Sequence, residues 1–377
     1  MDDRTVYKDM NIAYFISPHG YGHAARAAGI MTSLQKLDRG LHFEIFTTVP
    51  EWFFKESIPD RYTYHFLLTD IGFIQETPLR MNLKETVMRL EHFLPFDDSR
   101  IRELAGKVSD MRCRLLICDI APMGIAIAGK AGIPSVLVEN FTWDWLYEEY
   151  IGEDSRLIKH IEYLRNLFHG VDYHIQARPV CVPSNPDLAT LPVCRKARSP
   201  SATTRKRLSV PDGAKVVLIT MGGIKERYPF LDILRERKDI FFIIPGYSSR
   251  PKLHGNLSLL PRHSEYFHPD LINASDAVIG KVGYSTLSEV YYSGNPFGYV
   301  ARENFRESGI LVSFIEREMA GIAVKEEDFV TGEWISQLSS LLDLPRLQRS
   351  GPAGADQAAG FIYDLVKSGS CSDNHPH

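Results

Sequence analysis

Two histidines and an arginine lie close together in the segment ISPHGYGHAARAAG, where an apolar run gives way to an alanine-rich stretch. The segment holds His19, Gly20, Gly22, His23 and Arg26. A tight turn between a strand and a helix needs one or two glycines, but it does not need imidazole or guanidinium groups. Histidine transfers protons near neutral pH, and arginine anchors carboxylates or phosphates. The loop is therefore a candidate site, and a purely structural turn is the alternative.

A second segment, IGKVGYSTLSE, has the residue types of a phosphate site. It places Lys281 and Gly283 after an apolar run, Ser285 and Thr286 at the start of an expected helix, and Glu289 one turn further on. The free amides and positive dipole of a helix start favour phosphate, and lysine adds a full charge. The glutamate can accept hydrogen bonds from ribose hydroxyls. We predict a nucleoside diphosphate site, with plain helix caps and a solvated glutamate as the alternative.

A pair of glycines offers a further opening for phosphate. The run KVVLITMGG ends in Gly222 and Gly223 before an expected helix. Backbone without side chains lets a phosphate approach closely, although ordinary turn glycines explain the pair equally well.

These motifs require strands and helices that bring them together. In the first half, β-type runs such as IAYFIS, HFEIFTT, RLLICDI and PSVLVEN alternate with the helical patterns AARAAGIMTSLQKL and GIAIAGKAG. From Lys215 the alternation restarts with KVVLITMGG, FFIIPG, NLSLLP, DAVIGKVG and PFGYVA. Such alternation predicts parallel βαβ units. The fold class is therefore α/β, with two doubly wound Rossmann-like domains facing across a cleft, where the carboxyl ends of strands bind ligands.

The chain is expected to divide at a stretch rich in proline, serine, threonine and basic residues, LPVCRKARSPSATTRKRLSVPD. This stretch predicts a linker or mobile loop, and its basic run leaves a peripheral membrane contact open as an alternative. The expected parts are a domain at 1–190, the linker at 191–212, a second domain at 213–352, a helix at 353–367 that crosses back to the first domain, and a tail at 368–377.

The composition excludes several classes of protein. The chain has 377 residues, of which 44% are hydrophobic and 24% charged, as in soluble globular domains. A net charge of -4 provides no basic field for nucleic acid. No run reaches the roughly 18 apolar residues of a transmembrane helix, and the first ten residues do not resemble a secretory signal. The five scattered cysteines form no CxxC pair. We expect a cytoplasmic protein without a metal or a cofactor.

The motifs carry a family resemblance. KVGYSTLSEVYYSGNPFGYV resembles the donor signature of GT-B glycosyltransferases of the MurG and UDP-glycosyltransferase type, and GYGHAAR resembles their acceptor loop. More narrowly, NFTWDWLYEEY, IGKVGYSTLSE and YVARENFRESG are similar to the glycosyltransferase-like N-terminal half of plant-type L-arabinokinases. This second similarity covers nearly the whole chain. The sugar-kinase half of those proteins is absent, so we do not expect kinase activity.

The resemblance implies roles for individual residues. His23 is implied as the general base, with Asp119 of RLLICDI orienting it; His19 is the rival base, and a simple helix cap is the alternative role of Asp119. The implied donor-binding residues are Gly222, Gly223, Arg262, His263, Lys281, Gly283, Tyr284, Ser285, Thr286, Glu289, Glu303 and Asn304. Within this set, Arg262 or His263 is expected at the nucleobase. The implied acceptor-binding residues are His19, Gly20, Gly22, Arg26 and Trp143, and a core position is the alternative for Trp143.

The resemblance implies an inverting, metal-independent glycosyltransferase that moves a hexosyl or related sugar from a nucleotide-diphosphate donor, such as a UDP-sugar, to a hydroxyl acceptor. The chain lacks the Asp-x-Asp triplet that marks a divalent cation in the other glycosyltransferase fold. Two alternatives stay open. One is a sugar-nucleotide epimerase or hydrolase, and the other is a sugar-nucleotide-binding protein without turnover.

Overall fold

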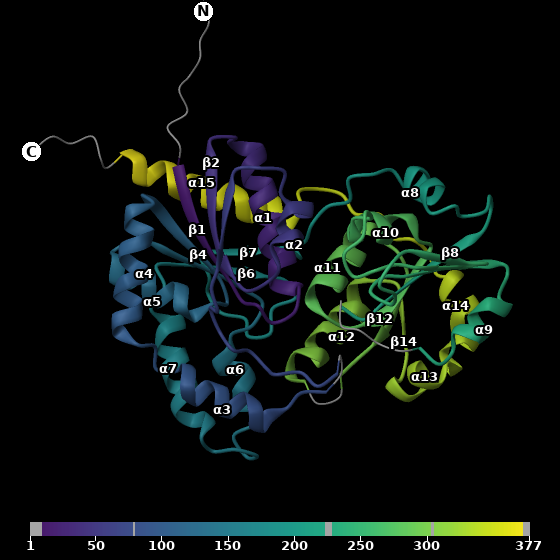
Figure 1. Ribbon diagram of the computed structural model, residues 1–377, viewed down its shortest axis with the longest axis horizontal. Helices are drawn as coiled ribbons and strands as arrows, with labels where there is room; N and C mark the ends of the chain where they lie inside the picture. The colour runs from purple at the N-terminus through teal and green to yellow at the C-terminus, as the bar shows by residue number, and fades with distance from the viewer. Residues whose placement is uncertain (1–9, 78–79, 223–227, 303–304, 372–377) are drawn as a thin grey trace, which may run out of the picture.

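Two seven-stranded sheets, each covered by helices on both faces, lie side by side in the molecule (Figure 1). The computed structural model describes residues 10–77, 80–222, 228–302 and 305–371. Within these residues no helix combines the length and the apolar character needed to cross a membrane. The two sheets match the predicted α/β class with two doubly wound domains.

The first sheet has the order β3-β2-β1-β4-β5-β6-β7 with all neighbours parallel. Its strands are β1 (Met10–Ile16), β2 (Leu41–Thr47), β3 (Tyr62–Phe66), β4 (Cys113–Asp119), β5 (Ser135–Glu139), β6 (Tyr173–Ala177) and β7 (Leu188–Thr190). In the register of β1 and β4, Ile16 lies opposite Asp119. Because both strands end there, the loop after β1 and the carboxylate that ends β4 meet at one edge of the sheet.

The second sheet has the order β10-β11-β9-β8-β12-β13-β14 and is parallel apart from the β10–β11 pair. Its strands are β8 (Lys215–Thr220), β9 (Ile240–Ile244), β10 (Lys252–His254), β11 (Leu257–Leu259), β12 (Ala277–Lys281), β13 (Phe297–Val300) and β14 (Gly321–Ala323). Thr220 lies opposite Gly280, and Lys281 lies opposite Val300. The turns that follow β8, β12 and β13 therefore share one edge.

Both faces of the first sheet are buried, which explains its nearly continuous apolar strands. One face packs against α1 (Gly22–Leu37), α2 (Glu51–Ser57) and α15 (Gly354–Cys371). The other face packs against α3 (Leu83–Phe93), α4 (Asp98–Asp110), α5 (Pro122–Ala131), α6 (Trp143–Glu148) and α7 (Leu157–His169).

The second sheet is covered in the same way. One face packs against α9 (Leu231–Glu236), α13 (Glu326–Thr331), the 3-10 helix η1 (Glu333–Gln337) and α14 (Leu338–Leu342). The other face packs against α10 (His268–Ala274), α11 (Tyr284–Ser293) and α12 (Arg306–Glu318). Helix α11 also contacts α1 of the first domain, so these two helices form part of the contact between the domains.

Two segments connect the domains. Residues 191–212, predicted as a linker or mobile loop, run from β7 to β8 and include α8 (Ser201–Arg207), which packs on α10. Arg195 in this segment is buried, so its guanidinium lies inside the protein and is not solvated. At the other end of the chain, α15 follows the second domain and packs along α1 of the first (Figure 1).

Candidate active site

A cavity lies between the two domains, at the carboxyl ends of both sheets. The first domain lines it with His19 and His23, and the second lines it with Lys281, Gly283 and Ser285. Its volume is about 690 Å³, open solvent included. We call this space the first cavity. The histidine loop and the start of α11, which lie about 260 residues apart in sequence, therefore face one shared space.

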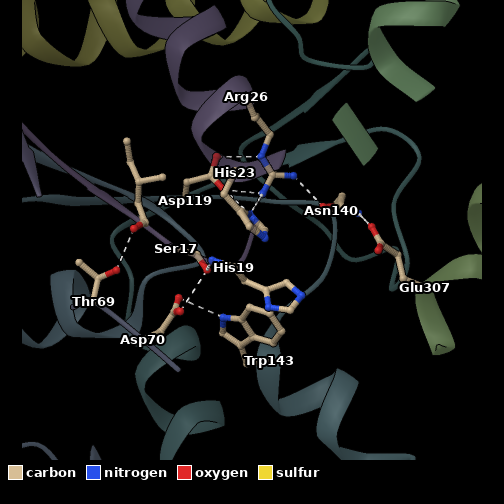
Figure 2. A network of polar contacts seen from close by, with 11 residues as sticks. Ser17, His19, His23, Arg26, Thr69, Asp70, Asp119, Asn140, Trp143 and Glu307 are labelled. Atoms are coloured by element: carbon tan, nitrogen blue, oxygen red, sulfur yellow. Dashed lines mark hydrogen bonds and ion pairs between the residues drawn. The ribbon is translucent and has the colours of Figure 1, made fainter. Parts of the chain in front are cut away.

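His23 and Asp119 form a hydrogen-bonded pair beside this cavity (Figure 2). His23 is the second residue of α1, and Asp119 ends β4, fully buried. His23 Nδ1 lies 2.8 Å from Asp119 Oδ1. Because Nδ1 is engaged, Nε2 is the ring nitrogen left for a substrate. This is the geometry of a general base oriented by a carboxylate.

Arg26, one helical turn after His23 in α1, also binds Asp119. Its Nε donates to Asp119 Oδ2 at 2.8 Å, its Nη2 donates to Asp119 Oδ1 at 2.6 Å, and its Nη1 donates to Asn140 Oδ1 at 2.6 Å. Burial alone raises the pKa of Asp119, but Arg26 and the bond to His23 outweigh burial and lower it. Asp119 is thus held ionised. The buried Arg26 guanidinium is directed at this carboxylate and also lines the first cavity, and its predicted contact with an acceptor stays a prediction.

His19 faces the same cavity, but Trp143 does not. The two rings pack edge to face, with centroids 5.2 Å apart. Trp143 is 1% exposed, and its Nε1 donates to Asp70 Oδ2 at 3.2 Å. The prediction that Trp143 contacts an acceptor is therefore wrong, because the indole fills the core behind His19. Burial, His23 and the nearby cations hold the pKa of His19 well below its usual value, so this imidazole is neutral.

Asp70 is a buried acid that sequence reasoning missed. It accepts hydrogen bonds from Ser17 Oγ at 3.1 Å and from Trp143 Nε1 (Figure 2). Burial raises the pKa of Asp70 to about 7, and the negative charge of Asp119 adds to this effect. The apolar run YHFLLTD ends at Asp70 as RLLICD ends at Asp119, so the same pattern could have found it.

The start of α11 has the properties of a phosphate site. Its N-cap is Gly283, with no side-chain hydrogen bond capping the helix. Lys281 lies beside this helix start, because a Cβ on Gly283 would be 4.0 Å from its Cε. Its Nζ also lies near the turn after β8, where a Cβ on Gly222 would be 3.6 Å away. Burial and the charge of Arg302 lower the pKa of Lys281 to about 7. A phosphate at this helix start would restore the full lysine charge.

A second cavity of about 780 Å³, open solvent included, continues from the first. The two share Tyr21, Gly22, Gly222, Ser285 and Thr286. The second cavity is lined further by Arg262, His268 and Glu289. Of the predicted phosphate residues, Gly222, Ser285 and Thr286 thus lie where the two cavities meet, and Lys281 and Gly283 line the first cavity alone. The second cavity is of a size that suits a nucleoside.

Glu289 and Tyr284 are already engaged by protein groups. The Glu289 oxygens accept from Arg195 Nε at 3.1 Å and from His268 Nδ1 at 2.8 Å. Burial raises the pKa of Glu289, but these partners outweigh burial and lower it. The predicted solvated alternative is therefore wrong. The Tyr284 hydroxyl accepts from the Val193 N–H at 3.0 Å, so this side chain binds the connecting segment while it lines the first cavity.

The two residues expected at the nucleobase differ in position. Arg262 lines the second cavity, with its guanidinium over the ring of Tyr21 at 4.8 Å. His263 stacks on Trp52 of the first domain, with centroids 4.7 Å apart. These aromatic partners were not predicted. Of the other residues expected on the donor side, Gly223, Glu303 and Asn304 lie outside the described residues.

Comparisons with known proteins agree with this architecture. No family model matches the chain. Over 374 residues, 97% of this chain, it is 25% identical to L-arabinokinase of Arabidopsis thaliana, and it spans 35% of that protein. It is also 24% identical over 297 residues to an uncharacterized glycosyltransferase of Methanopyrus kandleri, covering 70% of this chain and 81% of the relative.

Solved structures decide the fold. A UDP-glucosyltransferase from Polygonum tinctorium superposes with a TM-score of 0.60 at 14% identity, covering 96% of this chain and 100% of that one. The spinosyn forosaminyltransferase SpnP superposes with a TM-score of 0.58 at 16% identity, covering 96% and 95%. The chain has the GT-B fold. The resemblance read from the motifs is thereby confirmed for the fold.

Within the GT-B fold, the first cavity brings together residues from both domains. Of the predicted residues that are described, the cavity is lined by His19, Gly20, Gly22, His23, Arg26, Gly222, Lys281, Gly283, Tyr284, Ser285 and Thr286. In the part of the chain that the structure describes, no cluster of three or more histidines, cysteines or acids could hold a metal ion. Cys113, Cys118, Cys181 and Cys194 are buried free thiols.

Proposed function

We propose that this chain is a glycosyltransferase that moves a sugar from a nucleotide-diphosphate donor to a hydroxyl group of an acceptor. The observation that carries the proposal is the His23–Asp119 pair, which faces the uncapped start of α11 across one cavity. The GT-B fold and the relative named as a glycosyltransferase support it. The donor lies in the second cavity, with its phosphates at the junction and its sugar in the first.

In the proposed reaction, His23 Nε2 removes the proton from the acceptor hydroxyl as its oxygen attacks the anomeric carbon of the donor sugar. The bond from that carbon to the phosphate oxygen breaks, and the nucleoside diphosphate leaves with the electron pair. Asp119 stabilises the imidazolium that forms, as an ionised carboxylate next to Nδ1 does. Attack from the face opposite the leaving group inverts the anomeric centre.

The leaving diphosphate requires positive charge at the junction of the cavities. Lys281 and the free amides at the start of α11 provide it, because fixed donors stabilise charge that develops in the transition state. The protein supplies this charge itself in our proposal, so the reaction proceeds without a divalent cation.

The alternative of an epimerase or hydrolase requires further carboxylates in the cleft. Glu307 lines the first cavity, but its Oε1 accepts from Asn140 Nδ2 at 2.8 Å and its Oε2 lies 3.7 Å from Arg302 Nη2. A carboxylate held in this way is poorly placed to take a proton from a sugar. A binding protein without turnover would be favoured by a filled acceptor side, whereas His23 lines an open cavity. Both observations favour transfer.

The proposal is tested by nucleotide binding and by donor consumption. Thermal-shift measurements with UDP, GDP and dTDP are expected to show stabilisation by at least one of them, because binding to the native state raises its stability. With the matching nucleotide sugars and a mixture of hydroxyl acceptors, release of that diphosphate measures turnover. No stabilisation by any of the three would contradict the donor site.

His23→Ala isolates the chemistry from the binding. We expect turnover to fall by about 100-fold to 10,000-fold, since a positioned base contributes that much, while the affinity for the diphosphate stays unchanged. His19→Ala is the matched control, because His19 lines the same cavity without a carboxylate partner of this kind. Turnover that survives His23→Ala but not His19→Ala would assign the base to His19.

A further inference from the structure

Arg302 is a buried cation that the proposed reaction does not use. It follows β13 by two residues, lines the first cavity and is 8% exposed. Its guanidinium carbon lies 3.3 Å from the centroid of the Phe305 ring. Its buried Nε has no hydrogen-bond partner among the residues that the structure describes. A buried donor without a partner is costly, so this arrangement indicates a position that a ligand completes.

Glu307 compensates Arg302 only in part. The nearest approach between the two side chains, 3.7 Å from Nη2 to Oε2, exceeds hydrogen-bond length. The other carboxylate oxygen of Glu307 is engaged by Asn140. Burial lowers the pKa of Arg302 to about 10, which still leaves the guanidinium charged at neutral pH.

Arg302 faces the cavity that His19 also lines. Gly222 and Ser285 line both cavities, whereas Arg302, like Lys281 and Gly283, lines only the first. Its charge also acts on His19 and Tyr150 of the first domain. Arg302 therefore lies in the first cavity, where the proposed function places the transferred sugar, and its charge reaches His19 on the acceptor side.

We infer that Arg302 binds a carboxylate carried by one of the two substrates, so that one of them is an acidic sugar such as a uronic acid. A planar guanidinium pairs with a carboxylate through two parallel hydrogen bonds, and Nε is one of the donors in that arrangement. A single guanidinium beside Glu307 suits one negative charge better than the two of a phosphate monoester. The inference deepens the proposed function, since it names the substrate class of the same cavity.

Two matched pairs of ligands test the inference and identify the source of the carboxylate. Comparing the affinity for UDP-glucuronate with that for UDP-glucose tests whether the transferred sugar carries the carboxylate. Comparing free D-glucuronate with D-glucose tests whether the acceptor carries the carboxylate. Both are titrated with and without UDP and followed by ligand-observed NMR. We expect the acid to bind about tenfold or more tightly than its neutral partner in at least one pair, as a charge-assisted pair provides.

Arg302→Met is expected to remove this preference, since methionine fills similar volume without charge. Arg306→Met is the matched control: Arg306 lies over Trp145 and pairs with Glu148 at 2.9 Å, outside both cavities. This variant is expected to keep the preference. Thermal unfolding checks that both variants fold, and Arg302→Lys, which keeps the charge, is expected to retain part of the preference if Arg302→Met proves unstable.

Equal affinities within about twofold in both pairs would overturn the inference, and so would a preference for the acid that Arg302→Met leaves intact. A preference in the UDP-sugar pair places the carboxylate on the transferred sugar, and one in the free pair places it on the acceptor. Failure of UDP to bind bears on the nucleotide site alone, because the free pair without UDP still reports on Arg302.

Discussion

At the scale of single residues, burial sets the charge of the groups that face the first cavity. His19 is neutral, Asp119 is ionised, and the pKa of Lys281 is lowered to about 7 by burial and by Arg302. Without a ligand, the cavity is therefore less positive than the sequence suggests. An anion that binds beside Lys281 favours its protonated form, so binding and protonation are linked.

We expect nucleotide binding to weaken as the pH rises from 7 to 9. Below pH 7 Lys281 is already protonated in the free protein, so its contribution is fully present. Above pH 7 the diphosphate must draw in a proton, because it raises the lysine pKa above the free value of about 7. The Kd is expected to increase by up to about tenfold per pH unit. Calorimetric titration in two buffers of different ionisation enthalpy measures this proton uptake.

Lys281→Met is the matched variant for this prediction. It is expected to bind the diphosphate at least about tenfold more weakly at pH 7 and to take up no proton between pH 7 and 9. Proton uptake of unchanged size in the variant would show that another group is responsible.

At the scale of elements, one arginine of the connecting segment ties three helices together. Arg195 donates to Glu289 of α11 and lies 3.3 Å from Glu56 of α2. Its guanidinium also lies over the rings of Phe53 in α2 and Phe267, the N-cap residue of α10, at 4.5 and 5.0 Å. The connecting segment thus fixes the helix whose start forms the phosphate site.

Arg195→Met is expected to lower the free energy of unfolding by about 3–5 kcal/mol, because it leaves Glu289 buried with one charged partner fewer. The double variant Arg195→Met, Glu289→Gln is expected to lose less than the sum of the two single variants. Urea unfolding monitored by circular dichroism measures both. Lys206→Met, at an exposed position of α8, is the control and is expected to change stability by less than about 0.5 kcal/mol. Strictly additive losses would mean that the two side chains are not coupled.

At the scale of the whole molecule, the two domains are joined through buried polar contacts as well as through the chain. Asp119 binds Arg26, Arg26 binds Asn140, and Asn140 binds Glu307 of the second domain (Figure 2). The first-domain loop approaches α11 closely, because a Cβ on Gly22 would lie 3.8 Å from Ser285 Oγ. A ligand at the junction of the cavities therefore touches both domains.

Hydrogen exchange measured by mass spectrometry is expected to show this coupling. The diphosphate that stabilises the protein should slow amide exchange at the start of α11 and also in the first domain at Tyr21 and Gly22, since both segments line the junction. Residues 98–110 of α4, which lie outside both cavities, are the internal control and are expected to exchange at an unchanged rate. Protection confined to the second domain would contradict a shared site.

Local patterns were sufficient to predict much of this protein. Apolar runs, helical periodicity and turn glycines predicted the two α/β domains and most of the strands that carry the site, because they depend on neighbours in sequence. The same patterns placed His23 at a helix start and Gly283 at the beginning of α11. Site residues that can be recognised by their type and their place at the end of a strand could therefore be predicted from the sequence.

Contacts between distant segments depended on the tertiary structure. His23 and Asp119 are 96 positions apart, and the register of β1 and β4 brings them within 2.8 Å. The sequence left Trp143 open between an acceptor contact and the core, and only the packing behind His19 decided for the core. The orphaned Nε of Arg302 depends on burial that no local pattern encodes. Strand register, burial and charge pairing arise from the folded chain as a whole, which is why sequence alone determined the elements and their candidate residues while the fold decided their partners.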